Sequence, residues 1–435
     1  MTRKSLRVCI YAVLVCLFGL PLAGSAANPQ PLGSEVQVNT NNLSQLHNPA
    51  AAFDGAGHAL VVWENDLLGL RGRLYDAAGN ALGNELSLVA NAAWSVLPGT
   101  APVVFHRDPA IVFLPSGNFL LAWAEEHGTL EWMVYWENLQ VQSREIAVQE
   151  FNLAGQPVGR SYTISSSGVG LKSRPRLALR RAGDVVAAWM SWYGATPTPA
   201  SELGVFTRQL STTGKPNGGQ TQVDTVSGAI GSTPALAVDP DGSYLIAWTS
   251  QIGTDTFNTS IYGRVFAASG AALAAPFALS AGAVGPQGKP TVANDGQASY
   301  LVAWQGYFND LWHSRINGQI VSKAGGLLGK RQTISTGDGK FNLADAAPSA
   351  AVATGGTFVM VWMEWNHSFP VGLAGVQLDR SGVPLGSQVW INDQQIGAIS
   401  RTVLVTDGAG HYLTPYEGFE NQTTLGIRAR FFDAH

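Results

Sequence analysis

A proline and a tryptophan recur together along this chain, always 14 residues apart. A fixed spacing of this kind constrains the fold strongly, because it shows that one structural unit is built repeatedly. Six copies carry both residues, at Pro49 and Trp63, Pro109 and Trp123, Pro175 and Trp189, Pro234 and Trp248, Pro290 and Trp304, and Pro348 and Trp362. A seventh copy keeps the spacing with Thr402 and Tyr416 in the two places.

Each unit has the pattern of four short β-strands. In segments such as PALAVDPDGSYLIAW, two β-branched and aromatic runs flank an Asp, Asn or Gly turn, which is typical of a hairpin. A third strand, a turn such as LDRSGVPLG and a fourth strand such as SQVWIND follow. A sandwich has no reason to repeat one spacing seven times, whereas radial blades do. The sequence therefore predicts an all-β, seven-bladed β-propeller of four-stranded antiparallel blades.

The two ends of the chain indicate how this ring closes. The last unit stops at RARFFDAH, after its third strand, while PLGSEVQVNT near the N-terminus has the pattern of the missing turn and fourth strand. We expect residues 36–38 to pair with residues 428–432. Such pairing removes an exposed sheet edge and holds both termini in place.

The N-terminus has the features of a secretory signal peptide. Arg3, Lys4 and Arg7 precede an apolar run, and small residues follow in LAGSAA. We expect residues 1–27 to be removed, leaving residues 28–435 as a single propeller domain. The mature protein is then secreted or periplasmic, with no membrane span, and we expect it to be a monomer.

Charge and cysteine content narrow the range of ligands. The formal net charge is −4, and removal of three cationic residues with the signal peptide makes it about −7. Nucleic acid is not an expected partner, because binding its backbone needs clustered Lys and Arg. Both cysteines, Cys9 and Cys16, lie in the signal, so the mature chain contains no thiolate metal site. We expect no metal ion and no cofactor.

The connections that follow the second strands vary strongly in length, and variable loops on a rigid frame usually carry function. They are rich in aromatic residues, as in EEHGTLEWMVYWENLQ and SWYGATPTP. Aromatic faces can hold sugar rings or a protein partner, or they can simply pack one loop on another. The candidate ligand-binding residues are Trp132, Tyr135, Trp136, Trp192, Tyr193, Tyr307, Trp312, Glu364 and Trp365.

Carboxylates gather just beyond the second strands. They are Glu64, Asp66, Glu125, Glu126, Glu364, Glu417 and Glu420. If these segments converge on the central axis, paired acids there could shift one another's pKa, as glycoside hydrolysis requires. The alternative interpretation is a set of solvated loop acids on an acidic chain.

One segment resembles a known family. HRDPAIVFLPSGNFLLAWAEEH, residues 106–127, is similar to the first blade of sialidases. The resemblance implies that Arg107 binds a substrate carboxylate and places Glu125 in an acidic turn beside Glu126. The Asp boxes of sialidases are absent, and sialidases have six blades. Propeller polysaccharide lyases use His, Tyr and Arg, and the motifs HRD and LWHSR are compatible with that class.

These observations favour an extracytoplasmic recognition scaffold that binds a glycan or an extracellular protein through its variable rim. The alternative is a carbohydrate-active enzyme, either a sialidase-like hydrolase or a polysaccharide lyase. Its candidate catalytic residues are Arg107, Glu125 and Glu126. A structural part with no small ligand is the third possibility.

Overall fold

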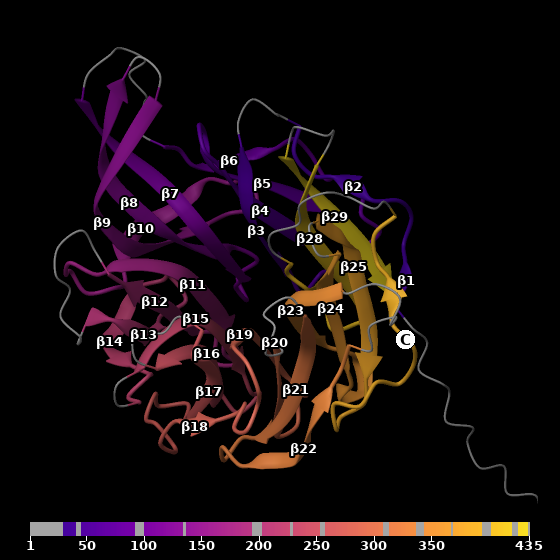
Figure 1. The fold of residues 1–435 in the computed structure, drawn as a ribbon. Coiled ribbons are helices and arrows are strands. Elements are labelled where there is room, and N and C mark those ends of the chain that lie inside the picture. Colours follow the sequence, from indigo (N-terminus) through magenta and orange to yellow (C-terminus); the bar gives the residue numbers. More distant parts are fainter. Residues whose placement is uncertain are drawn as a thin grey trace, which may run out of the picture.

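The computed structural model describes residues 29–433 apart from 41–44, 92–99, 134–135, 194–201, 227–228, 253–256, 308–312, 336–342, 367–368, 394–401 and 420–424. The described chain forms seven antiparallel sheets in a ring, so the predicted seven-bladed propeller is confirmed (Figure 1). The signal peptide prediction falls on residues outside this part. Among the described residues, no helix has the length and apolar character needed to cross a membrane.

The blades follow one another along the chain. Blade 1 contains β3 (Leu46–Phe53), β4 (Ala59–Asn65), β5 (Gly69–Tyr75) and β6 (Leu86–Val89). Blade 2 contains β7 (Thr100–Phe113), β8 (Phe119–Met133), β9 (Trp136–Phe151) and β10 (Pro157–Thr163). Blade 3 contains β11 (Leu171–Leu179), β12 (Val185–Trp192), β13 (Gly204–Leu210) and β14 (Pro216–Gln222). Blade 4 contains β15 (Ala229–Val238), β16 (Tyr244–Ile252), β17 (Thr259–Phe266) and β18 (Phe277–Ala278).

The remaining blades complete the ring. Blade 5 contains β19 (Gln287–Asn294), β20 (Ser299–Tyr307), β21 (Ser314–Ser322) and β22 (Leu327–Thr333). Blade 6 contains β23 (Leu343–Val352), the 3-10 turn η2 (Thr354–Gly356), β24 (Phe358–Asn366), β25 (Phe369–Leu378) and β26 (Val389–Trp390). Blade 7 combines β27 (Val405–Thr406), β28 (His411–Phe419) and β29 (Leu425–Asp433) with β1 (Gln30–Pro31) and β2 (Val36–Gln37) from the N-terminus.

The N-terminal strands close the ring as predicted. Val36 pairs with Ala429 and Gln37 pairs with Arg428, so β2 lies against β29. The β1 strand extends the same pairing, with Gln30 opposite Asp433. Blade 7 is therefore assembled from both ends of the described chain, which leaves β29 paired on both sides.

We call the repeated proline and tryptophan of each unit, and the Thr402 and Tyr416 that replace them in the seventh, the marker residues. The marker tryptophans lie in the buried cores between neighbouring blades. Trp63 and Trp123 are 1% and 3% exposed, and the other four are fully buried, as is Tyr416. Trp123 of blade 2 belongs to one buried cluster with Leu60 and Val62 of blade 1. Burying large aromatic side chains in this way removes much apolar surface from water and holds neighbouring sheets together.

The Asp turns of the first hairpins are explained by local hydrogen bonds. Asp54 Oδ1 accepts hydrogen bonds from the Ala56 and His58 N–H groups, both at 2.8 Å. Asp241 Oδ1 accepts the Ser243 N–H at 2.9 Å, and its Oδ2 lies 2.9 Å from Lys323 Nζ. An aspartate in this place stabilises the turn by bonding its own backbone.

A second repeated contact fastens the outer strands. In five blades, a Ser, Asp or Asn side chain two residues after the fourth strand accepts a backbone N–H from the third strand, 19 residues earlier. We call this contact the latch; its pairs are Ile146 and Ser165, Val205 and Asp224, Ile261 and Ser280, Ile316 and Ser335, and Leu373 and Asn392. In blade 7 the same place is taken by Asn39, which accepts the Ile427 N–H at 2.7 Å.

Candidate functional site

The start of each inner strand and the end of each second strand lie at one rim of the propeller, because Leu46 pairs with Asn65 and Leu171 pairs with Trp192. This is the variable rim. In each of six blades, the residue before the marker proline has a left-handed backbone there, with φ between 46° and 53°. We call these residues the axial ring: Asn48, Asp108, Arg174, Thr233, Lys289 and Ala347.

The axial ring surrounds a cavity on the propeller axis. The cavity has a volume of about 290 Å³ and is lined by ring residues from five blades together with Arg176, Pro290, Pro348 and Thr402. A further cavity of about 260 Å³ is lined by the inner strands below the ring, and Arg176 borders both. Ligand pockets in proteins usually have volumes of about 300 Å³ or more, so the cavity within the axial ring is about as large as the smallest of them. It can hold one sugar residue or one polar group.

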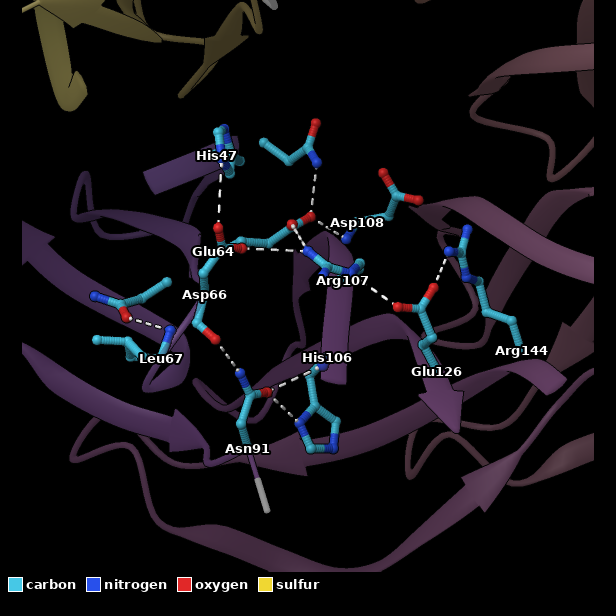
Figure 2. Close-up of polar contacts among 12 residues, drawn as sticks. His47, Glu64, Asp66, Leu67, Asn91, His106, Arg107, Asp108, Glu126 and Arg144 are labelled. Carbon is cyan, nitrogen blue, oxygen red and sulfur yellow. Dashed lines mark hydrogen bonds and ion pairs between the residues drawn. The ribbon is translucent and has the colours of Figure 1, made fainter. Parts of the chain in front are cut away.

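An ion network lies beside the cavity on blades 1 and 2 (Figure 2). Arg107 is its centre, with Nη1 3.2 Å from Asp66 Oδ1 and 3.8 Å from Glu64 Oε2, and with Nε 3.3 Å from Glu126 Oε1. Arg144 forms a second ion pair with Glu126. The sequence motif HRD therefore places its arginine among carboxylates of its own chain.

Four of the acids predicted beyond the second strands lie within those strands and are buried rather than solvated, whereas the side chains of Asp66 and Glu125 are 33% exposed. Glu64, Glu126, Glu364 and Glu417 are each 1 to 3% exposed. Two of them hold the axial ring: Glu64 accepts the Asp108 N–H, and Glu417 Oε1 accepts the Asn48 N–H at 2.6 Å. Thr249 does the same for the Lys289 N–H at 3.2 Å. The residue after the marker thus anchors the left-handed backbone of the next blade.

Burial changes the protonation of this network. It raises the pKa of Glu64 to about 7, assisted by the negative charge of Asp108 and opposed by hydrogen bonds from Asp108 and Asn48. The pKa of His47 is raised by its hydrogen bond to Glu417 and by nearby acids, against the effect of burial. Glu64 can therefore change charge close to neutral pH, and the surrounding acids favour the protonated form of His47.

The three predicted catalytic residues occupy different environments. Glu126 is enclosed between Arg107 and Arg144, whereas Glu125 has a side chain that is 33% exposed. The Glu125 carboxylate lies 3.0 Å from His127 Nε2 and 3.8 Å from His106 Nε2. Glu125 is thus the member of the three that a ligand could reach together with imidazole groups.

The predicted aromatic residues also separate into groups. Trp192 and Tyr193 are 36% and 49% exposed and meet edge to face at the variable rim, with ring centroids 5.8 Å apart. Tyr307 is half-buried and lines a pocket of about 160 Å³ together with Arg315 and Arg331. Burial raises the pKa of Tyr307.

The other predicted residues either do not line the axial cavity or lie outside the residues that the structure describes. Trp365 packs on the core shared by blades 6 and 7, and Glu364 Oε1 accepts a 2.7 Å hydrogen bond from Gln388. Tyr135 and Trp312 are outside the described residues, as is Glu420. Trp132 and Trp136 belong to β8 and β9, and their side chains are outside the described part.

The aromatic insertion of blade 2, predicted as a loop, is largely a hairpin. Strands β8 and β9 contain 15 and 16 residues, and their pairing continues to Met133 opposite Trp136. The hairpin projects beyond the ring (Figure 1). Within the hairpin, Leu139 packs against Val103 and Phe105.

Sequence reasoning did not single out the axial ring. The signal was present, because the ring residue stands immediately before each proline used to define the repeat. The sequence does not predict the left-handed backbone of these residues, because this conformation is unusual before proline. It arises where the register of the inner strand shifts, for example between Ser173 and Arg176.

No family model matches the chain, and no curated protein matches it. Among solved structures, the propeller is similar to an ulvan lyase of a new polysaccharide lyase family, bound to -[GlcA(1-4)Rha3S]-, with a TM-score of 0.58 and 8% identity over 92% of this chain and 95% of that one. A protein of unknown function from Dyadobacter fermentans DSM 18053 has a TM-score of 0.52 and 12% identity, over 78% of this chain and 100% of its own. The NanB sialidase of Streptococcus pneumoniae has a TM-score of 0.46 and 10% identity, over 93% and 70%. At these identities the similarity concerns the fold.

Proposed function

We propose that this protein is an extracytoplasmic recognition propeller that binds carbohydrate at its variable rim, and that residues 1–27 direct its export. The observation that carries the proposal is an exposed aromatic pair, Trp192 and Tyr193, near a polar cavity on the axis. Trp192 pairs with Leu171, and Arg174 of the cavity lies three residues further along β11, roughly 10 Å at the usual rise of a strand. One short oligosaccharide can span that distance.

The chemistry of these two features suits a sugar. Aromatic rings offer flat apolar faces with a polar edge, which match the CH-bearing face of a pyranose. The cavity supplies polar side chains from Asn48, Thr233 and Thr402. Ligand sites generally combine apolar faces with a few fixed polar groups in this way. The ulvan lyase with the same fold is bound to an oligosaccharide, which supports the same class of ligand here.

Binding is favoured over catalysis because most acids near the cavity already hold protein groups. Glu64 and Glu417 accept backbone N–H groups of the axial ring, and Glu126 pairs with two arginines. A catalytic carboxylate must instead be within reach of the scissile bond.

A carbohydrate-active enzyme on the same rim is the second candidate. Burial lowers the pKa of His106, so its imidazole is neutral at pH 7 and able to accept a proton. Its Nδ1 lies 3.1 Å from Asn91 Oδ1, which leaves Nε2 directed toward Glu125. An orienting amide behind a neutral imidazole is compatible with general base chemistry.

The test is a screen of the secreted protein against a glycan array and a panel of polysaccharides, recording retention, new reducing ends and unsaturated uronates. Retention without turnover is expected. Trp192→Ala and Tyr193→Ala should each weaken binding roughly tenfold, as for an aromatic contact of about 1.4 kcal/mol. Trp390→Ala is the matched control, because Trp390 is 51% exposed on the outer strand of blade 6.

Turnover that is lost in Glu125→Gln would establish the enzyme instead. Absence of both retention and turnover across the panel would overturn the proposed function.

A further inference from the structure

Three cationic side chains line one side of the axial cavity. They are Arg174 and Arg176 on β11 and Lys289 on β19, and we call them the cationic arc. Among the described residues that line this cavity, none is acidic. The cavity thus has a local positive charge on a chain whose net charge is negative.

The fold holds the arc in place. Arg174 and Lys289 both belong to the axial ring, each with φ of 53°. A left-handed backbone in a non-glycine residue is strained and persists only where its surroundings fix it. Here the Arg174 N–H is bound by Asp108 Oδ2 at 3.1 Å and the Lys289 N–H by Thr249 Oγ1 at 3.2 Å. The two cations therefore start from rigid positions on blades 3 and 5.

The arrangement brings like charges together. Lys289 is accessible to solvent through the cavity, and protein atoms of the surrounding blades enclose its ammonium group. This desolvation, together with the positive charge of Arg174, lowers the pKa of Lys289. The one carboxylate of the axial ring, Asp108 of blade 2, borders the arc through the Arg174 N–H, and it also interacts electrostatically with Arg144, so its charge is shared between the two cations. A bound anion would relieve the repulsion between the cations, and guanidinium groups suit planar carboxylate or tetrahedral sulfate.

We infer that the axial cavity binds the acidic group of a uronic acid or sulfated sugar through Arg174, Arg176 and Lys289. This inference rests on the proposed carbohydrate function and names the class of sugar. The acidic group enters the cavity, and the neighbouring sugar extends toward Trp192 and Tyr193.

The experiment compares three polysaccharides at one ionic strength: polygalacturonate, which carries carboxylates, dextran sulfate, which carries sulfates, and neutral dextran. We expect retention of at least one charged polymer, and the tighter of the two identifies the acidic group. Arg174→Gln and Lys289→Gln should each weaken that binding by about tenfold or more, the usual effect of losing a hydrogen bond to a charged group. Lys330→Gln, on the exposed outer strand β22, should change it less than about twofold.

Two outcomes would overturn the inference while leaving the proposed function intact. Neutral glycans could bind as well as charged ones, or charged ones could bind equally to the wild type and both variants. If no polysaccharide is retained, free galacturonate and sodium sulfate still test the arc. Either should raise the thermal midpoint of the wild type but not that of Arg174→Gln, and equal shifts in both proteins would refute the site.

Discussion

Asn39 and Ile427 are 388 residues apart in the sequence, yet the Ile427 N–H donates a 2.7 Å hydrogen bond to Asn39 Oδ1. In blade 6 the same bond joins Leu373 to Asn392 over only 19 residues, also at 2.7 Å. The N-terminal segment therefore reproduces, in a blade made from two ends, the contact that other blades form locally. Because the two bonds are alike, they offer a matched test of closure.

We predict that Asn39→Ala and Asn392→Ala lower the free energy of unfolding by similar amounts, about 1 to 3 kcal/mol each, since each leaves a buried N–H without its acceptor. Urea unfolding followed by tryptophan fluorescence measures both. Removal of residues 34–39 should lower the thermal midpoint by many degrees, because it also exposes the edge of β29. If Asn392→Ala lowers the free energy of unfolding and Asn39→Ala does not, the result would contradict closure of the ring by the N-terminal segment.

The fold was predictable because its signals are local and repeated. Pro49 and Trp63 mark a hairpin that recurs at one spacing, and PLGSEVQVNT matches a segment that other blades carry in full. The latch was also readable, as an apolar residue followed by Ser, Asn or Asp after each fourth strand. It was missed because such residues are also ordinary loop residues.

The site was less predictable because it depends on contacts between blades. Nothing local shows that Glu64 anchors the Asp108 backbone of the next blade, or that Arg107 is surrounded by Glu64, Asp66 and Glu126. The sialidase resemblance assigned Arg107 to a ligand from a local sequence match over residues 106–127. Its surroundings decide its role, and they become visible only when blades 1 and 2 are packed together.

Trp248 provides a test of packing between blades. It is fully buried with Val186 and Ala188 of the preceding blade, so Trp248→Ala should destabilise the protein by about 3 to 5 kcal/mol. Trp390→Ala, at an exposed position, should change stability by less than about 0.5 kcal/mol. Thermal and urea unfolding of both variants measure the difference, and equal stability would show that the marker residues do not hold the ring.

We predict that Arg107 stabilises the packing of blade 1 against blade 2 through its ion pairs with carboxylates of both blades. Arg107→Ala leaves Glu64 and Glu126 buried without one of their cations, at a cost of about 3 to 5 kcal/mol. The loss should be larger at pH 8 than at pH 5, because Glu64, whose pKa is about 7, can take up a proton at the lower pH. Arg160→Ala, on exposed β10, is the control. An Arg107→Ala variant with normal stability that no longer binds glycan would instead support the role implied by the sialidases.

Asp224 makes the latch of blade 3 sensitive to pH. It is the acidic member of the set, accepting the Val205 N–H at 2.9 Å and the Gly231 N–H at 2.6 Å, and burial raises its pKa from 3.8 to about 6. A raised carboxyl pKa means that the folded state holds a proton that the unfolded state has released, so stability falls as pH rises from about 4 to about 6. Relative to wild type, Asp224→Asn should therefore gain up to about 3 kcal/mol between pH 4 and pH 7, at 1.36 kcal/mol per pKa unit. Ser280→Ala removes a latch that does not titrate, so its difference from wild type should stay constant over that range. A flat difference for Asp224→Asn as well, measured by urea unfolding at both pH values, would show that Asp224 is ionised in the folded protein throughout.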